Sequence, residues 1–145
     1  MRNGLGRALA ISVGLGVLAA CGSAATSSTP TATVAQVLAG HQLLAPIAAE
    51  ELLRTPPQGL VIIDVRTPDE FAAGHIAGAI DIDLNGATFA DDVAKLDPNV
   101  PYFVYCHSGN RSAQAVAYML QAGIGSIYEL QGGIGAWQSA GAPIV

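Results

Sequence analysis

The fold is decided by one stretch of the sequence, Pro101-Tyr-Phe-Val-Tyr-Cys-His-Ser-Gly-Asn-Arg-Ser112. Tyr102–Tyr105 is apolar, aromatic and β-branched, which predicts a buried strand that ends at Cys106. A helical pattern then runs from Arg111 to Ala122. Where a strand passes through a tight loop into a helix, backbone N–H groups converge, and such a place binds anions and lowers the pKa of a thiol. The stretch therefore predicts an anion-binding loop around the Cys106 thiol.

Further strands and helices alternate on both sides of this loop. We expect strands at Leu60–Val65, Ala79–Ile82 and Ile127–Leu130, and helices at Ala48–Arg54, Thr67–Ala73, Asp91–Leu96 and 134–140. Pro46–Ile47 is interpreted as the start of an edge strand, and Val34–Leu44 as a linker or a marginal helix. Alternation of this kind favours an α/β fold, here a three-layer sandwich with a mostly parallel central sheet.

The N-terminus has the pattern of a bacterial lipoprotein signal peptide. Arg2 and Arg7 precede an apolar run from Ala8 to Ala20, which is short for a membrane span. The run ends in Leu18-Ala-Ala-Cys21-Gly22, which resembles a lipobox whose cysteine is lipidated and becomes the first residue. An ordinary signal peptide with an incidental Cys21 is the weaker alternative. We predict a signal peptide at 1–20, a Ser/Thr/Ala-rich tether at 21–43, and a folded domain at 44–145.

This organisation predicts an extracytoplasmic protein that acyl chains such as palmitate, attached to Cys21, anchor to the bacterial cell membrane. Loss of residues 1–20 leaves four basic and eleven acidic side chains, a net charge of −7. So acidic a domain is a poor candidate for binding nucleic acid or anionic lipid. The sequence leaves open the oligomeric state, the Gram type of the cell and the membrane that carries the anchor.

The chain has two cysteines. Lipidation would consume Cys21, so Cys106 would be a lone thiol in a compartment where thiols tend to be paired. A thiol–disulfide role is therefore a weak alternative, since no second cysteine can resolve a mixed disulfide. No cluster of Cys and His is available for a zinc site, and we predict neither a metal nor a cofactor.

Three stretches, taken in order, resemble the rhodanese-like family of single-domain sulfurtransferases. The first is Ile63-Asp-Val-Arg-Thr-Pro-Asp-Glu-Phe71, followed by Gly74-His-Ile-Ala-Gly-Ala79. The second is the loop from Cys106 to Arg111 with Ser112, and the third is Gly132-Gly-Ile-Gly-Ala-Trp137. The resemblance covers about residues 44–145 and implies a thiosulfate sulfurtransferase, a transferase that works through a persulfide on Cys106.

In the implied reaction the Cys106 thiolate takes a sulfur from a small anionic donor such as thiosulfate and passes it to cyanide, to a thiol, or to an unidentified protein acceptor. The N–H groups from His107 to Arg111 are expected to stabilise the anion, with Gly109 supplying permissive backbone angles. Arg111 either binds the donor or braces the loop through a carboxylate. His107 and Ser108 are expected at the entrance, where they can hydrogen-bond the donor, with a solvent-facing position as the alternative for His107. Asn110 belongs to the same predicted anion-binding loop, and Ser112 is expected to cap the helix with or without donating to the sulfur.

Several residues that suggest acid–base chemistry are interpreted as structural support. Arg66 and Glu70 are expected to form an ion pair across the strand-to-helix turn, while Asp64 accepts loop N–H groups. His75 is expected to be a hydrogen-bonded structural histidine, and Trp137 a core anchor.

Two other classes of function remain. Phosphatases and arsenate reductases of the same fold carry the loop pattern Cys-x5-Arg. That loop is one residue longer than the Cys106-x4-Arg111 loop of this chain. Rhodanese-like binding or regulatory modules typically lack the cysteine. Release of phosphate from an aryl phosphate would favour the first alternative, and full biological activity of Cys106→Ser would favour the second.

Overall fold

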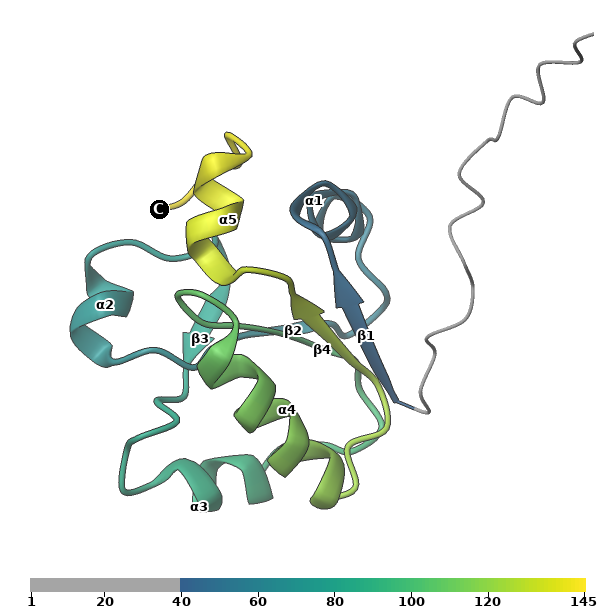
Figure 1. Cartoon of the computed structure of the whole chain (residues 1–145). Coiled ribbons are helices and arrows are strands. Elements are labelled where there is room, and N and C mark those ends of the chain that lie inside the picture. The colour runs from purple at the N-terminus through teal and green to yellow at the C-terminus, as the bar shows by residue number, and fades with distance from the viewer. Residues whose placement is uncertain (1–39) are drawn as a thin grey trace, which may run out of the picture. The chain divides into compact units, whose positions relative to one another are not determined.

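The computed structural model describes residues 40–145 (Figure 1). Five strands form one sheet in the order β1-β5-β4-β2-β3, and every neighbouring pair is parallel. The strands are β1 His41–Leu44, β2 Val61–Asp64, β3 Ala79–Asp81, β4 Tyr102–Tyr105 and β5 Ile127–Leu130. The helices are α1 Pro46–Arg54, α2 Pro68–Ala72, α3 Phe89–Ala94, α4 Asn110–Gln121 and α5 Gly133–Ser139. The predicted α/β sandwich is confirmed. The predicted signal peptide, Cys21 and most of the predicted tether lie outside the described residues.

Strand β4 lies at the centre of the sheet, and all four of its residues are buried. Because side chains alternate along a strand, Tyr102 and Val104 pack with α3 and α4 on one face. Phe103 and Tyr105 pack on the other face, where α1 and α5 supply the cover. An uninterrupted apolar run is what a parallel strand covered on both faces requires.

The edge of the sheet differs from the sequence-based prediction. His41–Leu44 forms strand β1 in register with β5, and it begins before the predicted start of the domain at residue 44. The prediction of an edge strand at Pro46 is wrong, because Pro46 occupies the first turn of α1. Proline suits that position, since the first N–H groups of a helix have no partner within the helix. The N–H group of Gln131 donates to the Leu44 carbonyl at 2.8 Å and secures the end of β1.

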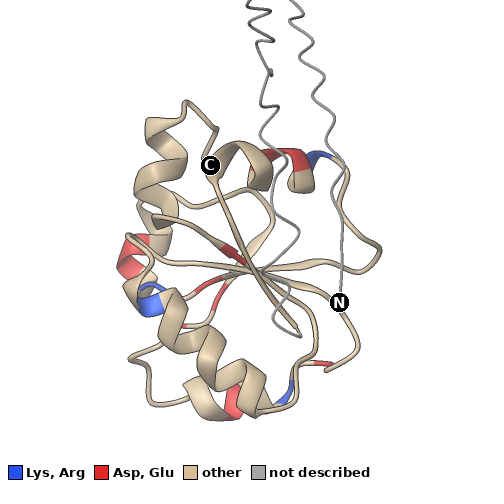
Figure 2. Cartoon of the chain, turned by 45° about the vertical axis from the view of Figure 1, so that its right-hand side comes forward, with Lys and Arg blue, Asp and Glu red and all other residues tan. Residues whose placement is uncertain are grey.

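Charged side chains are few on this domain (Figure 2). Each basic side chain in residues 40–145 lies against a carboxylate: Arg54 against Glu50 and Glu51, Arg66 against Asp64, Lys95 against Asp92, and Arg111 against Glu70. In the same range, no helix is long and apolar enough to cross a membrane. No group of three potential metal ligands occurs within these residues.

Candidate active site

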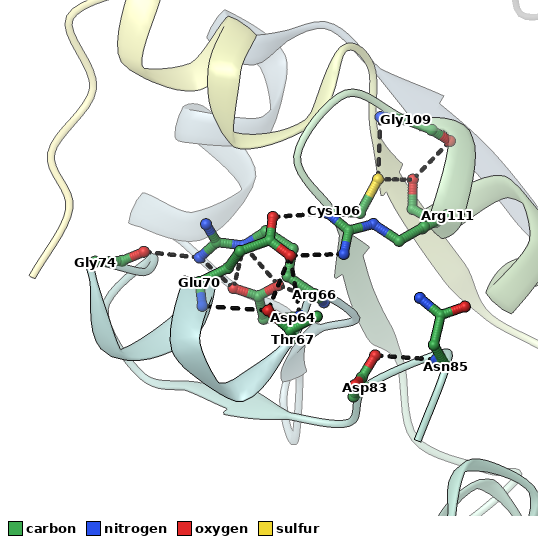
Figure 3. A network of polar contacts seen from close by, with 11 residues as sticks. Asp64, Arg66, Thr67, Glu70, Gly74, Asp83, Asn85, Cys106, Gly109 and Arg111 are labelled. Carbon is green, nitrogen blue, oxygen red and sulfur yellow. Dashed lines mark hydrogen bonds and ion pairs between the residues drawn. The ribbon is translucent and has the colours of Figure 1, made fainter. Parts of the chain in front are cut away.

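The active loop begins where β4 ends and closes at the start of α4 (Figure 3). Cys106 is 1 % exposed, and the Gly109 N–H donates to its Sγ at 3.1 Å. Gly109 has φ of 99° and caps α4 with its backbone in the left-handed region, a conformation that costs glycine little. The helix therefore begins one residue earlier than predicted, at Asn110, and Ser112 lies within its first turn rather than capping it.

Hydrogen bonds to the sulfur favour its anion. Burial acts to raise the pKa of Cys106, but hydrogen bonds from the backbone N–H and the hydroxyl of Ser112 and from the backbone N–H groups of Ser108 and Gly109 outweigh it, so the pKa lies below that of an ordinary thiol. The convergence of N–H groups predicted from the strand–loop–helix pattern is thus present in the structure. The same donors suit a persulfide anion on Cys106.

A glycine pair on the neighbouring segment supports the loop from behind. The N–H groups of Ile134 and Gly135 donate to the carbonyls of Cys106 and His107 at 2.8 and 3.1 Å. Gly133 has φ of 61°, and a Cβ there would collide with the Cys106 carbonyl oxygen and lie 2.6 Å from the His107 carbonyl. Gly133 is therefore required because the two backbones meet with no room for a side chain, and at Gly132, where φ is 73°, a Cβ would collide with the Ala136 side chain.

Arg111 braces the loop through a carboxylate, one of its two predicted roles. Its two terminal nitrogens each donate to one oxygen of Glu70 at 2.7 Å, which ties α4 to α2 (Figure 3). The Arg111 guanidinium, together with N–H and hydroxyl donors of Thr67, lowers the pKa of Glu70 to about 2 against the opposing effect of burial. Glu70 also completes a capping box with Thr67, so one carboxylate holds both the start of α2 and the active loop.

The predicted Arg66–Glu70 ion pair is wrong. Arg66 instead pairs with Asp64, two residues earlier, at 2.6 Å, and both side chains are buried. The Arg66 guanidinium also donates to the Gly74 carbonyl at 2.7 Å and lies over the Tyr105 ring. The Arg66 side chain points into the domain and neutralises the buried Asp64 carboxylate, which would otherwise have no charged partner. Glu70 is part-exposed and binds Arg111 instead. Asp64 accepts the Arg66 N–H at 3.0 Å, so this part of the prediction agrees with the structure.

The remaining predicted residues occupy the rim and the core. His107, Ser108 and Asn110 are exposed at the loop surface, in line with the solvent-facing alternative for His107. The His75 ring nitrogen lies 3.0 Å from the Phe71 carbonyl, and the ring stacks on Phe71. Trp137 is 3 % exposed and donates to the Pro143 carbonyl at 2.8 Å. Both residues are structural, as expected.

Two residues of the site were not predicted. Glu129 is 4 % exposed on β5 and accepts a hydrogen bond from the Ser112 hydroxyl at 2.7 Å. His41 on β1 lies 2.9 Å from the other Glu129 oxygen. An acidic residue inside the apolar run Ile127-Tyr-Glu-Leu130 was the available signal, because a buried parallel strand rarely carries a charge without a reason.

Comparison with known proteins identifies the fold and its family. Residues 46–140 match the rhodanese-like domain. Thiosulfate sulfurtransferase GlpE from Pseudomonas aeruginosa is 39% identical over 93 residues, covering 64% of this chain and 83% of that protein. GlpE from Pseudomonas putida is 36% identical over 98 residues, covering 61% of this chain and 87% of that protein.

Solved structures agree with this identification. A rhodanese-related protein from Thermoplasma volcanium has a TM-score of 0.62 and 31% identity, covering 72% of this chain and 97% of its own. A Rhodopseudomonas palustris protein of unknown function, described as a possible tyrosine phosphatase, has a TM-score of 0.60 and 28% identity, covering 72% and 84%. The prediction of a thiosulfate sulfurtransferase-like enzyme of the rhodanese type is confirmed by the family match and the names of the relatives. The chain belongs to the rhodanese-like domain family.

Proposed function

We propose that the protein moves sulfane sulfur from thiosulfate, or a similar small anionic donor, to a thiophilic acceptor through a persulfide on Cys106. One observation carries the proposal: a buried thiol of lowered pKa lies in a loop whose backbone N–H groups point at its sulfur. The names of the curated relatives support thiosulfate as the donor.

In the first step the Cys106 thiolate attacks the outer sulfur of thiosulfate. A new S–S bond forms, the S–S bond of thiosulfate breaks, and sulfite leaves with the electron pair. The N–H groups of the loop stabilise the negative charge that develops on the outer sulfur of the Cys106 persulfide. In the second step cyanide or a thiolate attacks that outer sulfur, and the Cys106 thiolate leaves. No proton, metal or redox cofactor is needed to balance either step.

Incubation with thiosulfate followed by intact mass measurement tests this mechanism. We expect the protein to gain about one sulfur atom, and cyanide to remove it with release of thiocyanate. Cys106→Ser is the matched control and should gain nothing. Absence of an adduct with thiosulfate and with other sulfane donors would contradict the proposal.

The phosphatase alternative is supported by the similar structure from Rhodopseudomonas palustris, which is described as a possible tyrosine phosphatase. Against it, only four residues separate Cys106 from Arg111, and both terminal nitrogens of Arg111 are already bound to Glu70. An oxyanion would have to compete with that carboxylate for the guanidinium. Release of phosphate from an aryl phosphate, without thiocyanate from thiosulfate and cyanide, would replace our assignment.

We further propose that the enzyme is exported and held at the membrane by lipid on Cys21. The sequence Leu18-Ala-Ala-Cys21 after an apolar run supports this. In a bacterial host, the full chain should incorporate a labelled fatty acid and sediment with membranes. Cys21→Ala should abolish the label, and a chain that stays labelled without Cys21 would disprove this anchor.

A further inference from the structure

The Ser112 hydroxyl lies between two groups that can be anions. Its oxygen is 3.6 Å from the Cys106 sulfur and 2.7 Å from Oε1 of Glu129, and it is also 3.0 Å from the Gly109 carbonyl oxygen. A serine hydroxyl carries a single proton. It can therefore donate to only one of these three acceptors at a time.

Glu129 is the strongest of the three acceptors. Its contact with Ser112 is the shortest, and a hydrogen bond to a carboxylate is stronger than one to a neutral carbonyl. Glu129 and Ser112 are both buried, so water does not replace the Ser112 hydroxyl as a hydrogen-bond donor to the carboxylate. In the neutral thiol, Cys106 donates its own proton to the Ser112 oxygen and Ser112 donates to Glu129, while the Gly109 carbonyl accepts from the Ala113 N–H at 3.0 Å. When the thiol ionises, its sulfur and Glu129 both need the same proton.

His41 of β1 flanks Glu129 on the side away from Ser112. Nε2 of His41 lies 2.9 Å from Oε2, although the ring is not aligned to donate a hydrogen bond along that line. Arg111 of α4 interacts electrostatically with Cys106, but its guanidinium already binds Glu70 of α2 and also lies in the field of Asp83. Glu129 is thus the one carboxylate that reaches the sulfur through a shared donor within the described residues.

We propose that Glu129 sets the reactivity of Cys106 by competing with its sulfur for the hydroxyl proton of Ser112. The backbone N–H groups of the loop stabilise the sulfur anion, and Glu129 limits that stabilisation. The sulfur therefore stays more basic than the loop alone would make it. Glu129 is a positioning residue in this scheme, because it acts through Ser112.

The consequence for catalysis rests on the proposed function. The competition affects the two half-reactions, formation of the persulfide and its discharge to the acceptor, in opposite directions. A more basic thiolate attacks thiosulfate faster, whereas a less basic thiolate is the better leaving group when the acceptor takes the outer sulfur. Glu129 thereby favours loading of the sulfur at the expense of its delivery. A role that is only structural would slow both half-reactions together.

The first experiment measures the thiol pKa without any sulfur transfer. The rate of alkylation by iodoacetamide is followed against pH in the purified full chain, on the peptide that contains Cys106. Glu129→Gln keeps the shape of the side chain and removes its charge, and we expect the thiol pKa to fall by about one unit. Glu51→Gln, an exposed charge removal on α1, is the matched control and should leave the pKa unchanged. An unchanged or raised thiol pKa in folded Glu129→Gln would overturn the proposal.

Ser112→Ala gives a second test that does not depend on replacing Glu129. Because Glu129 holds the hydroxyl proton, its loss should raise the thiol pKa by less than about 0.3 units. A rise of about one unit, which a full hydrogen bond to the sulfur would produce, would show that the sulfur holds the proton and would overturn the proposal. In the Ser112→Ala background, Glu129→Gln should lower the thiol pKa by clearly less than in the wild type. An equal effect would mean that Glu129 acts on the sulfur without Ser112.

The second experiment separates this inference from the proposed function. In rapid mixing, Glu129→Gln should form the persulfide about threefold more slowly at high pH and discharge it to cyanide about threefold faster. If both half-reactions slow in Glu129→Gln, the inference is overturned, whereas the proposed sulfurtransferase function is not. If wild-type protein forms no persulfide but the alkylation shift is present, the proposed function fails and the competition for the Ser112 proton stands.

Discussion

Two carboxylate–guanidinium pairs stand beside each other in Figure 3 and differ in what they hold. Asp64 and Arg66 are separated by two positions in the sequence and are both buried at the carboxyl end of β2. Glu70 and Arg111 are 41 positions apart, and their side chains keep 33% and 24% of their surface exposed. The buried pair fixes the turn after β2, and the half-exposed pair fixes the active loop. A pair inside the domain is therefore expected to control stability, and a pair at its surface to control activity.

Asp64→Asn should give the largest effect on stability. It removes the charge that compensates buried Arg66, and breaking a buried pair by removing one partner typically costs about 3–5 kcal/mol. Chemical denaturation followed by intrinsic fluorescence would measure the loss. Asp91→Asn, at an exposed position of α3, is the control and should change the free energy of unfolding little. If Asp64→Asn were as stable as this control, the buried pair would not hold the turn.

Glu70→Gln should show the reverse pattern. Because the pair is part-exposed, its loss should lower the free energy of unfolding by only about 1 kcal/mol. Release of Arg111 would loosen the loop, and a small misplacement of a reacting group is costly, so persulfide formation should slow by about tenfold or more. Stopped-flow loading with thiosulfate would measure this effect. Full activity of Glu70→Gln would show that the loop holds its shape without the brace.

The acid stability of the domain should report the half-exposed pair. The pKa of Glu70 is lowered to about 2 by Arg111, so its stabilising contribution is complete above the ordinary value of 4.5. This contribution is lost as the pH falls from 4.5 through about 2. The difference in free energy of unfolding between wild type and Glu70→Gln should therefore shrink over this interval. A difference that stayed constant across it would mean that the pair does not lower the pKa of Glu70.

Lys95→Gln should give the smallest effect. Its partner Asp92 lies 2.8 Å away on the surface of α3, and the lysine side chain is 73% exposed. Exposed pairs of this kind are screened by water and salt. We expect unchanged melting temperature and unchanged persulfide formation, measured by calorimetry and stopped flow. A clear decrease in the melting temperature or in the rate of persulfide formation would contradict the expectation that the burial of an ion pair determines its effect.

Much of the fold could be predicted from local sequence signals. The run Tyr102–Tyr105 predicted the bounds of β4, because a central parallel strand needs apolar residues on both faces. Thr67-Pro68 with Glu70 predicted the start of α2 through a capping box that the structure contains. Strand β1 was missed, since two of its residues are exposed and, among the described residues, it pairs with β5 on one side alone. An edge strand of this kind has little periodicity of its own.

By itself, the sequence determined the alternation of strands and helices, the position of Cys106 between a strand and a helix, and the four-residue spacing to Arg111. These follow from short-range rules, because backbone propensity and hydrophobic pattern act over a few residues. Only the tertiary structure decided which charges meet. Arg66 pairs with the buried Asp64, and Glu70 pairs with Arg111. Glu129 contacts Ser112 because β5 lies beside β4 in the sheet. Side chains far apart in the chain meet only once the sheet order is set, and burial then determines how strongly they interact.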